Sequence, residues 1–263
     1  MHINFAKYHG AGNDFILIDN RGRLINPTDN NLIANLCHRH FGIGADGLIL
    51  LENSKEADFR MVYFNADGYE GTMCGNGGRC VTAFAHSIGL IKEQTRFIAS
   101  DGIHMAKVLK AQNAYWLVRL SLSDVTSFQK FDDGYFLNTG SPHFVKFVDD
   151  AESIDVIPEG KRYRWDERFK PEGTNVNFVE VNKNKLIVKT FERGVEDHTL
   201  SCGTGITASA LAAAIFTGEN FTNYEVLSPG GSLQVSFEKV TEVFTNIILE
   251  GPAERSFEGS VKV

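Results

Sequence analysis

The sequence predicts an α+β protein of two pseudo-symmetric domains, in each of which a curved mixed β-sheet or barrel wraps around one central buried helix. Three observations support this prediction. A cysteine followed by glycines and then by a helix occurs twice, at residues 74–89 and 202–218. The second helix, residues 206–216, carries small or apolar side chains all round, which is typical of a helix buried on every side. Short stretches with strand character stand before and after each helix.

The two halves of the chain repeat each other at a constant spacing. Cys202 lies 128 residues after Cys74, and Ser141 lies the same 128 residues after Asn13. An offset that is kept at two separate places indicates an internal duplication. Pseudo-twofold symmetry of this kind can bring the two helix N-termini together at the interface between the domains.

The boundary between the domains is expected where the sequence becomes polar and loses its periodicity, at residues 121–133. We therefore expect an N-terminal α+β domain over residues 1–122, completed by residues 251–263. The C-terminal α+β domain is expected over residues 123–250.

The N-terminal half alternates glycine-rich turns with short apolar runs. A glycine loop at residues 7–15 leads into the first strand. A helix is expected at residues 29–40 with Thr28 as its N-cap, and a second at residues 80–88, ended by Gly89. The strands of this half are expected at residues 16–19, 48–51, 59–64, 95–99, 103–108 and 115–120.

The C-terminal half repeats these signals, with different residues between them. Residues 140–149 and a strand ending at residues 189–194 match segments of the first half. Charged side chains crowd residues 159–172, which indicates a solvated surface helix or loop. The end of the chain is expected to form strand, turn and strand at residues 246–249, 251–253 and 256–263.

Composition and charge narrow the classes of function. The formal net charge of −7 at pH 7 provides no basic surface, so no nucleic acid partner is expected. No apolar run is long enough to span a bilayer, and the N-terminal segment lacks the pattern of a signal peptide, so no membrane partner is expected. The four cysteines are then expected to be reduced thiols in a cytoplasmic protein.

Cys74 and Cys202 are the candidate catalytic residues, because each stands just before a helix. The unsatisfied N–H groups and the positive end of the helix dipole bind anions there and raise the thiolate fraction of a thiol. If the two cysteines meet across an interdomain cleft, a thiolate can remove a proton from carbon while a thiol returns one from the opposite face. Inversion of a stereocentre needs this arrangement, and the scheme requires neither a pyridoxal cofactor nor a metal.

Several motifs stand in a specific order along the whole chain. They occupy residues 9–15, 42–47, 64–68, 73–80, 141–143, 191–194 and 201–205. With this set the chain resembles the diaminopimelate epimerases, which need no cofactor. The resemblance implies interconversion of LL- and meso-2,6-diaminopimelate in lysine and peptidoglycan precursor synthesis, with Cys74 and Cys202 as the acid/base pair. It also implies a homodimer and a diaminopimelate epimerase-like fold.

The resemblance implies roles for further residues, one position at a time. His143 and Glu192 match positions that tune the pKa values of the thiols. The chain departs from the common pattern where Ser141 replaces an asparagine and where Asp197-His198-Thr199 replaces Gly-Glu-Thr. The substrate-binding positions are matched by Asn13, Asn65, Gly75, Asn76, Ser141, Asn175, Glu192, Arg193, Gly203 and Thr204.

Other functions leave different signals. Residues 42–47 match the glycine pattern of a dinucleotide site, but a helix is expected before them and a strand after them, the reverse of the required order. Residues 37–40 look like metal ligands, but a second cluster with matching spacing is missing. A thiol redox protein would show the motif Cys-x-x-Cys, which is absent from this sequence. A related isomerase acting on proline or hydroxyproline is the nearest alternative, and a non-enzymatic binding module would not need both cysteines.

Overall fold

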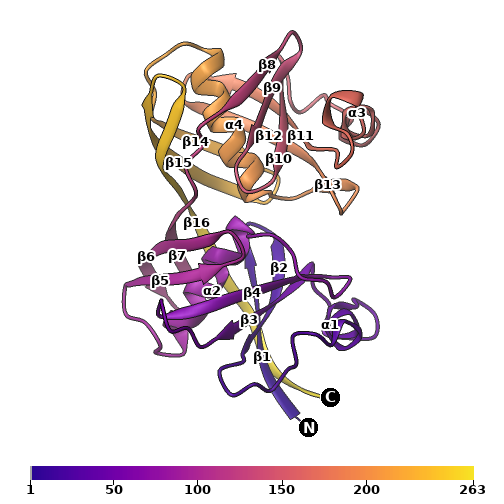
Figure 1. Cartoon of the computed structure of the whole chain (residues 1–263), viewed down its shortest axis with the longest axis vertical. Coiled ribbons are helices and arrows are strands. Elements are labelled where there is room, and N and C mark those ends of the chain that lie inside the picture. The colour runs from indigo at the N-terminus through magenta and orange to yellow at the C-terminus, as the bar shows by residue number, and fades with distance from the viewer. Residues whose placement is uncertain (1) are drawn as a thin grey trace. The chain divides into compact units, whose positions relative to one another are not determined.

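The computed structural model describes residues 2–263 and divides the chain into two compact units (Figure 1). Unit 1 runs from the N-terminus to Leu120 and includes Gly251–Val263, and unit 2 is Ser121–Glu250. The C-terminal strand β16, Val243–Lys262, therefore contributes its first part to unit 2 and its remainder to unit 1. No helix within residues 2–263 combines the length and the apolar character needed to cross a membrane.

Unit 1 is a closed barrel of eight strands. Seven follow one another in the sheet, and β16 closes the barrel because it pairs with both β7 and β1. The pairs β2–β3 and β4–β5 are parallel and the others are antiparallel, so the sheet is mixed. The strands are β1 His2–Gly10, β2 Asn13–Asp19, β3 Gly47–Glu52, β4 Phe59–Asn65, β5 Gln94–Ala99, β6 Gly102–Gln112 and β7 Tyr115–Ser121.

Helix α2, Gly75–Ser87, is the central helix of this barrel. It packs against β1, β2, β3, β4 and β6, and residues 75–85 are all buried. The helix begins five residues earlier than expected, so the glycines of the predicted bend are helical. Packing explains why glycines stand inside the helix. A Cβ at Gly77 would lie 3.0 Å from the Ile49 side chain and one at Gly78 would lie 2.7 Å from the Met73 side chain, which is too close for a larger residue.

Helix α1, Asn30–Cys37, lies between β2 and β3 in the chain and buries Ile33, Leu36 and Cys37. The predicted N-cap, Thr28, is wrong. The side chain of Asp29 caps the helix by accepting a hydrogen bond from the N–H of Leu32 at 3.0 Å. The hydroxyl of Thr28 instead donates to the side chain of Asn26.

Unit 2 follows the same plan around helix α4, Gly203–Phe216. The helix packs against six strands, and residues 203–214 are all buried, whereas Phe216 is 52% exposed. A bridge between Val125 and Phe244 brings the start of this unit beside β16. The sheet path is β8 Phe128–Phe131, β9 Gly134–Asn138, β10 Pro142–Phe147, β11 Asn175–Asn182, β12 Lys185–Glu192, β14 Asn223–Ser228, β15 Gly231–Val240 and β16, with β13 Asp197–Thr199 paired to β12.

The two units repeat one topology. The order β1-β2-α1-β3-β4-α2-β5-β6 in unit 1 corresponds to β9-β10-α3-β11-β12-α4-β14-β15 in unit 2. Each corresponding strand pair is parallel or antiparallel in the same sense in both units. This agrees with the predicted α+β fold class and with the predicted internal duplication.

One expectation for the C-terminal half is wrong, and a second is confirmed only in part. Strand β16 continues through the predicted turn, because Pro252 occupies a ladder position opposite Leu117 and uses only its carbonyl, which accepts from Arg79 Nε at 3.2 Å. The charged stretch 159–172 is mostly exposed helix and loop, as expected, but it is not uniformly solvated. It contains the end of α3, Val156–Arg164, and the short helix η1, Glu167–Phe169, and it buries Tyr163, Arg164 and Phe169.

Candidate active site

Both candidate cysteines are the N-cap residues of the central helices. Cys74 precedes α2 with φ −110° and ψ 120°, and Cys202 precedes α4 with φ −118° and ψ 107°. This extended backbone places each cysteine beside the first N–H groups of its helix, which have no acceptor inside the helix. The predicted placement of each thiol at the positive end of a helix dipole is thus correct.

In unit 1 the sulfur of Cys74 faces the side chain of Asn13. The distance from Cys74 Sγ to Asn13 Oδ1 is 3.7 Å. The same oxygen accepts a hydrogen bond from Asn76 Nδ2 at 3.2 Å. On its other side the amide of Asn13 donates to Asp46 Oδ2 at 2.8 Å. Because a carboxylate only accepts, this last bond orients the amide so that its oxygen points to Cys74.

Arg79 is a fully buried cation behind this group. Its Nη2 donates to Asn76 Oδ1 at 2.9 Å, and its other nitrogens donate to the carbonyls of Gly75 and Pro252. Burial lowers the pKa of Arg79 to about 10, which leaves the side chain charged at neutral pH. Arg79 therefore ties the first turn of α2 to β16 and holds Asn76 against Asn13.

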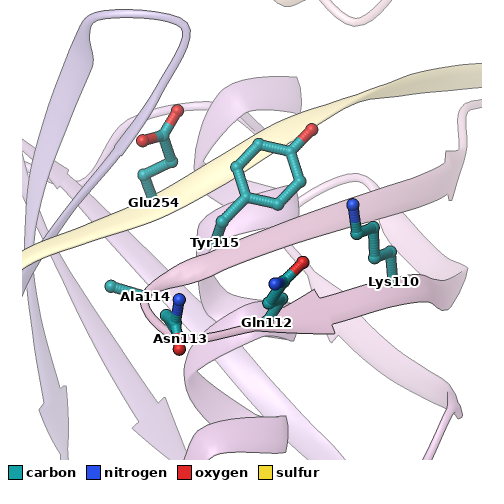
Figure 2. A pocket seen from close by; sticks show the side chains of 6 residues that line it. All are labelled: Lys110, Gln112, Asn113, Ala114, Tyr115 and Glu254. Atoms are coloured by element: carbon teal, nitrogen blue, oxygen red, sulfur yellow. The ribbon is translucent and has the colours of Figure 1, made fainter.

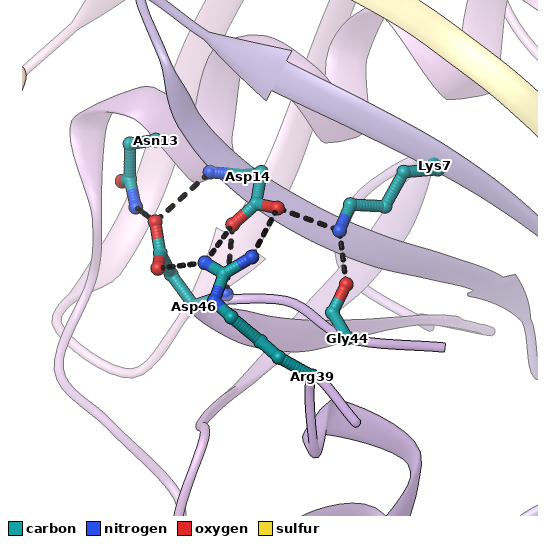
Figure 3. Close-up of polar contacts among 6 residues, drawn as sticks. All are labelled: Lys7, Asn13, Asp14, Arg39, Gly44 and Asp46. Atoms are coloured by element: carbon teal, nitrogen blue, oxygen red, sulfur yellow. Dashed lines mark hydrogen bonds and ion pairs between the residues drawn. The ribbon is translucent and has the colours of Figure 1, made fainter. Parts of the chain in front are cut away.

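An ion-pair network anchors the other side of Asn13 (Figure 3). Asp14 Oδ2 lies 2.6 Å from Lys7 Nζ, and Asp14 Oδ1 lies 2.9 Å from Arg39 Nη2. The same Arg39 nitrogen lies 2.6 Å from Asp46 Oδ1. The ammonium of Lys7 further donates to the carbonyl of Gly44. Although burial alone would raise the pKa of Asp14, hydrogen bonds from Arg39 and Lys7 outweigh it and lower that pKa to about 2.

The depressed pKa of Asp14 predicts an acid-dependent loss of stability. A carboxyl whose pKa falls on folding stabilises the protein above its unfolded pKa, and that contribution is lost as pH falls through the folded pKa. Asp14→Asn should lower the free energy of unfolding at pH 7 by roughly 2 kcal/mol or less. The difference from wild type should shrink as pH falls from about 4 towards about 2.

Urea unfolding at pH 7, 4 and 3 measures this effect. Glu56→Gln is a matched control, because that exposed side chain loses one charge without touching the network. A difference between Asp14→Asn and wild type that stays constant over this pH range would contradict the assignment.

In unit 2 a chain of hydrogen bonds reaches the sulfur of Cys202. Its Sγ lies 3.5 Å from Thr204 Oγ1, and that hydroxyl lies 2.9 Å from His143 Nε2. The opposite ring nitrogen, Nδ1, lies 3.1 Å from Asn177 Nδ2. Burial and the charge of Arg193 lower the pKa of His143 to about 3, so the ring is neutral at physiological pH.

A second group of polar residues lies beside this chain. Asn175 Nδ2 donates to Ser141 Oγ at 3.0 Å, and Asn175 Oδ1 accepts from the N–H of Arg193 at 2.8 Å. Ser141 Oγ is also 3.0 Å from His143 Nε2. The guanidinium of Arg193 has a long ion pair, 3.7 Å, with the exposed carboxylate of Glu172. Such a pair holds the arginine weakly and leaves it able to take another carboxylate.

The structure brings most predicted residues of each half to one end of its barrel. In unit 1 the starts of β2 and α2 and the end of β4 carry Asn13, Gly75, Asn76 and Asn65. Asn65 is exposed, and its Oδ1 accepts from the hydroxyl of Tyr63 at 3.0 Å. In unit 2 the starts of β10, β11 and α4 and the end of β12 carry the rest: Ser141, His143, Asn175, Glu192, Arg193, Gly203 and Thr204.

The residues of these networks that sequence patterns did not indicate include Asp46, Arg79, Asn177 and Thr190, whose hydroxyl donates to Asn177 Oδ1 at 3.0 Å. Asp46 and Arg79 lie inside two of the glycine motifs, which was the available signal. Asn177 follows Asn175 by two residues and so faces the same side of its strand. Thr190 has no distinguishing signal in the sequence.

Other features of the structure lie apart from these residues. A hollow of about 420 Å³ at the β6–β7 turn is lined by residues such as Lys110, Tyr115 and Glu254 (Figure 2). A second, of about 710 Å³, lies in unit 2 near Phe147 and Phe216. Neither lining includes a predicted site residue. Across residues 2–263, no three His, Cys, Asp or Glu side chains come together as a metal site.

Comparison with known proteins decides the family. The sequence model described as diaminopimelate epimerase matches residues 5–118 and 135–255. A diaminopimelate epimerase of Flavobacterium psychrophilum is 48% identical over 260 residues, which cover 98% of this chain and 100% of that protein. The chain belongs to the diaminopimelate epimerase family. A second member, from Chlorobaculum tepidum, is 44% identical and covers 96% of this chain and 98% of its own.

Solved structures resemble this chain at lower identity. A PhzF-family phenazine biosynthesis protein of Bacillus anthracis has a TM-score of 0.76 at 17% identity, with 100% of both chains covered. A hydroxyproline epimerase of Agrobacterium vitis has a TM-score of 0.74 at 13% identity, covering 99% of this chain and 92% of its own. At these identities the likeness establishes the fold alone, and it confirms the predicted fold class.

Proposed function

We propose that this protein is an isomerase that interconverts LL-2,6-diaminopimelate and meso-diaminopimelate by a two-base mechanism without pyridoxal phosphate, with Cys74 and Cys202 as the pair. The observation that carries the proposal is the duplicated geometry: each cysteine caps a buried helix in a family named for this epimerisation. The hydroxyproline epimerase shares the fold alone, so the related proline isomerases remain the second candidate.

The proposed chemistry moves one proton on each face of the substrate's α-carbon. The thiolate of one cysteine removes the α-proton and becomes a thiol. The thiol of the other cysteine gives its proton to the opposite face and becomes a thiolate, so charge and protons balance. The N–H groups that open α2 and α4, beginning at Gly75 and Gly203, would bind the α-carboxylate and the charge that develops on it.

The other end of diaminopimelate carries a second carboxylate and needs its own partners. Arg193 supplies a charged fork, and the amides of Asn65 and Asn175 supply hydrogen bonds, in the proposed role of substrate-binding residues. Ser141 Oγ already accepts a hydrogen bond from Asn175 and lies 3.0 Å from His143 Nε2, so it contributes less. In the same proposal His143 and Glu192 tune the pKa values of the thiols.

The remaining parts of the proposal concern the setting of the enzyme. We infer a cytoplasmic homodimer in lysine and peptidoglycan precursor synthesis, with a small-molecule substrate and no nucleic acid or membrane partner. We also infer that the folding domains are residues 1–122 with 251–263 and residues 123–250. Gel filtration with light scattering tests the dimer.

Proton NMR in heavy water tests the proposed function. With LL-diaminopimelate and a catalytic amount of the enzyme, the α-proton signal of the substrate should disappear as deuterium replaces this proton. Signals of the meso isomer should grow at the same time. L-Proline under the same conditions should keep its α-proton. Faster exchange of L-proline than of diaminopimelate would assign the protein to the related isomerases instead.

A further inference from the structure

Asn177 holds an amide orientation that its neighbours dictate. The side chain is fully buried on β11, and its Nδ2 lies 3.2 Å from the carbonyl oxygen of Phe144. A carbonyl oxygen only accepts, so the atom facing it is the NH₂ group. On the other side the oxygen of the amide accepts from the hydroxyl of Thr190 on β12 at 3.0 Å. The amide is thus fixed from both ends.

The packing of α4 leaves no space for another arrangement. A Cβ at Gly205 would lie 2.4 Å from Asn177 Oδ1 and 3.2 Å from His143 Cε1. The third residue of the helix is therefore a glycine whose backbone presses on both side chains. Rotation of the Asn177 amide or of the imidazole would require the helix to move.

The orientation of Asn177 determines which nitrogen of His143 carries the proton. The NH₂ group of Asn177 faces His143 Nδ1 at 3.1 Å, so Nδ1 accepts and has no proton. The burial of the ring and the charge of Arg193 keep the imidazole neutral. A neutral ring with a bare Nδ1 carries its proton on Nε2, the nitrogen that faces Ser141 and Thr204.

The hydroxyl of Thr204 must then donate elsewhere. It cannot give its proton to Nε2, because that nitrogen is already protonated. The other acceptor in contact with it is Cys202 Sγ, at 3.5 Å. A hydrogen bond donated to sulfur stabilises the thiolate more than the thiol, because the thiolate carries the negative charge.

We infer that Asn177 and Thr190 are positioning residues that hold His143 in its Nε2–H tautomer and thereby aim the hydroxyl of Thr204 at Cys202, which favours the thiolate of this cysteine. The consequence for catalysis rests on the proposed function, because it makes Cys202 the better prepared proton acceptor. The tautomer itself is a property of the enzyme without substrate.

Nitrogen NMR of the substrate-free enzyme tests the tautomer. In protein labelled with ¹⁵N-histidine, long-range ¹H–¹⁵N correlations should show His143 as neutral with the proton on Nε2, and loss of these signals in His143→Gln identifies them. In Asn177→Asp the new carboxylate can only accept, so Nδ1 should become protonated. A wild-type ring protonated on Nδ1, or an unchanged tautomer in a folded Asn177→Asp protein, would overturn the inference.

Alkylation of Cys202 by iodoacetamide, mapped by mass spectrometry, is the second readout. Thr190→Val removes one hydrogen bond from Asn177 and should slow alkylation of Cys202 at neutral pH by roughly fivefold. Thr190→Ser keeps the hydroxyl and should restore the wild-type rate. The rate at Cys74 in unit 1 should stay unchanged in both variants. Equal rates at Cys202 in Thr190→Val and Thr190→Ser would contradict the positioning role.

Both readouts use no substrate. Failure of diaminopimelate turnover would therefore count against the proposed function, and an incorrect tautomer would count against this inference.

Discussion

Cys74→Ala and Cys202→Ala are each expected to abolish epimerisation. A two-base mechanism has one proton-transfer group on each face of the substrate, so neither cysteine can replace the other. Loss of a positioned acid or base lowers the rate by about 10²–10⁴-fold, and loss of either half of the pair stops inversion altogether. The measurement is interconversion of LL- and meso-diaminopimelate, followed by separation of the isomers.

Cys37→Ala is the matched control for these variants. Cys37 is buried in unit 1, where burial raises the pKa of its thiol to about 12, so it carries no charge at neutral pH. This variant should keep kcat/KM within about twofold, as expected for a site away from the chemistry. Near-normal turnover by Cys74→Ala or Cys202→Ala would remove that cysteine from the mechanism.

Arg193→Ala is expected to have the next largest effect. Without the guanidinium, the distal carboxylate of diaminopimelate enters the site without a charged partner. Truncating one member of a hydrogen-bonded charge pair costs about 2–5 kcal/mol, so kcat/KM should fall roughly 30-fold or more. Steady-state kinetics on diaminopimelate gives the value.

Two neighbouring variants separate this role from local structure. Glu172→Ala removes only the long, exposed ion pair of Arg193 and should change kcat/KM little. Ser141→Ala removes one neutral hydrogen-bonding group and should cost on the order of 1 kcal/mol. Full activity of Arg193→Ala, or an effect no larger than that of Glu172→Ala, would show that the distal carboxylate is bound by other residues.

The fold class could be predicted because its determinants are local in the sequence. The small and apolar residues of α4 indicate that this helix is buried. The repeated cysteine-glycine elements indicate that the chain is duplicated. Element limits were less predictable where tertiary packing overrides propensity. The glycines that open α2 disfavour a helix in isolation, yet close neighbours require them there.

The candidate site was predictable only in part, for a similar reason. Motifs locate the cysteines and the residues beside them, such as Asn13 and Ser141. Hydrogen bonds between distant positions leave no sequence pattern, so the bond from Thr190 to Asn177 could not be read from the chain. Nor could the carbonyl of Pro252 be recognised as a partner of Arg79.

The closure of unit 1 by β16 reverses the usual order of events during protein synthesis. Domains made first on the ribosome generally fold first. Here the edges of β1 and β7 that pair with β16 stay uncovered until residues 251–262 have emerged, after all of unit 2 has been translated. Until then the nascent N-terminal half carries two open strand edges, which are sites of mispairing between chains. The half of the protein that is translated first is therefore the half that finishes folding last.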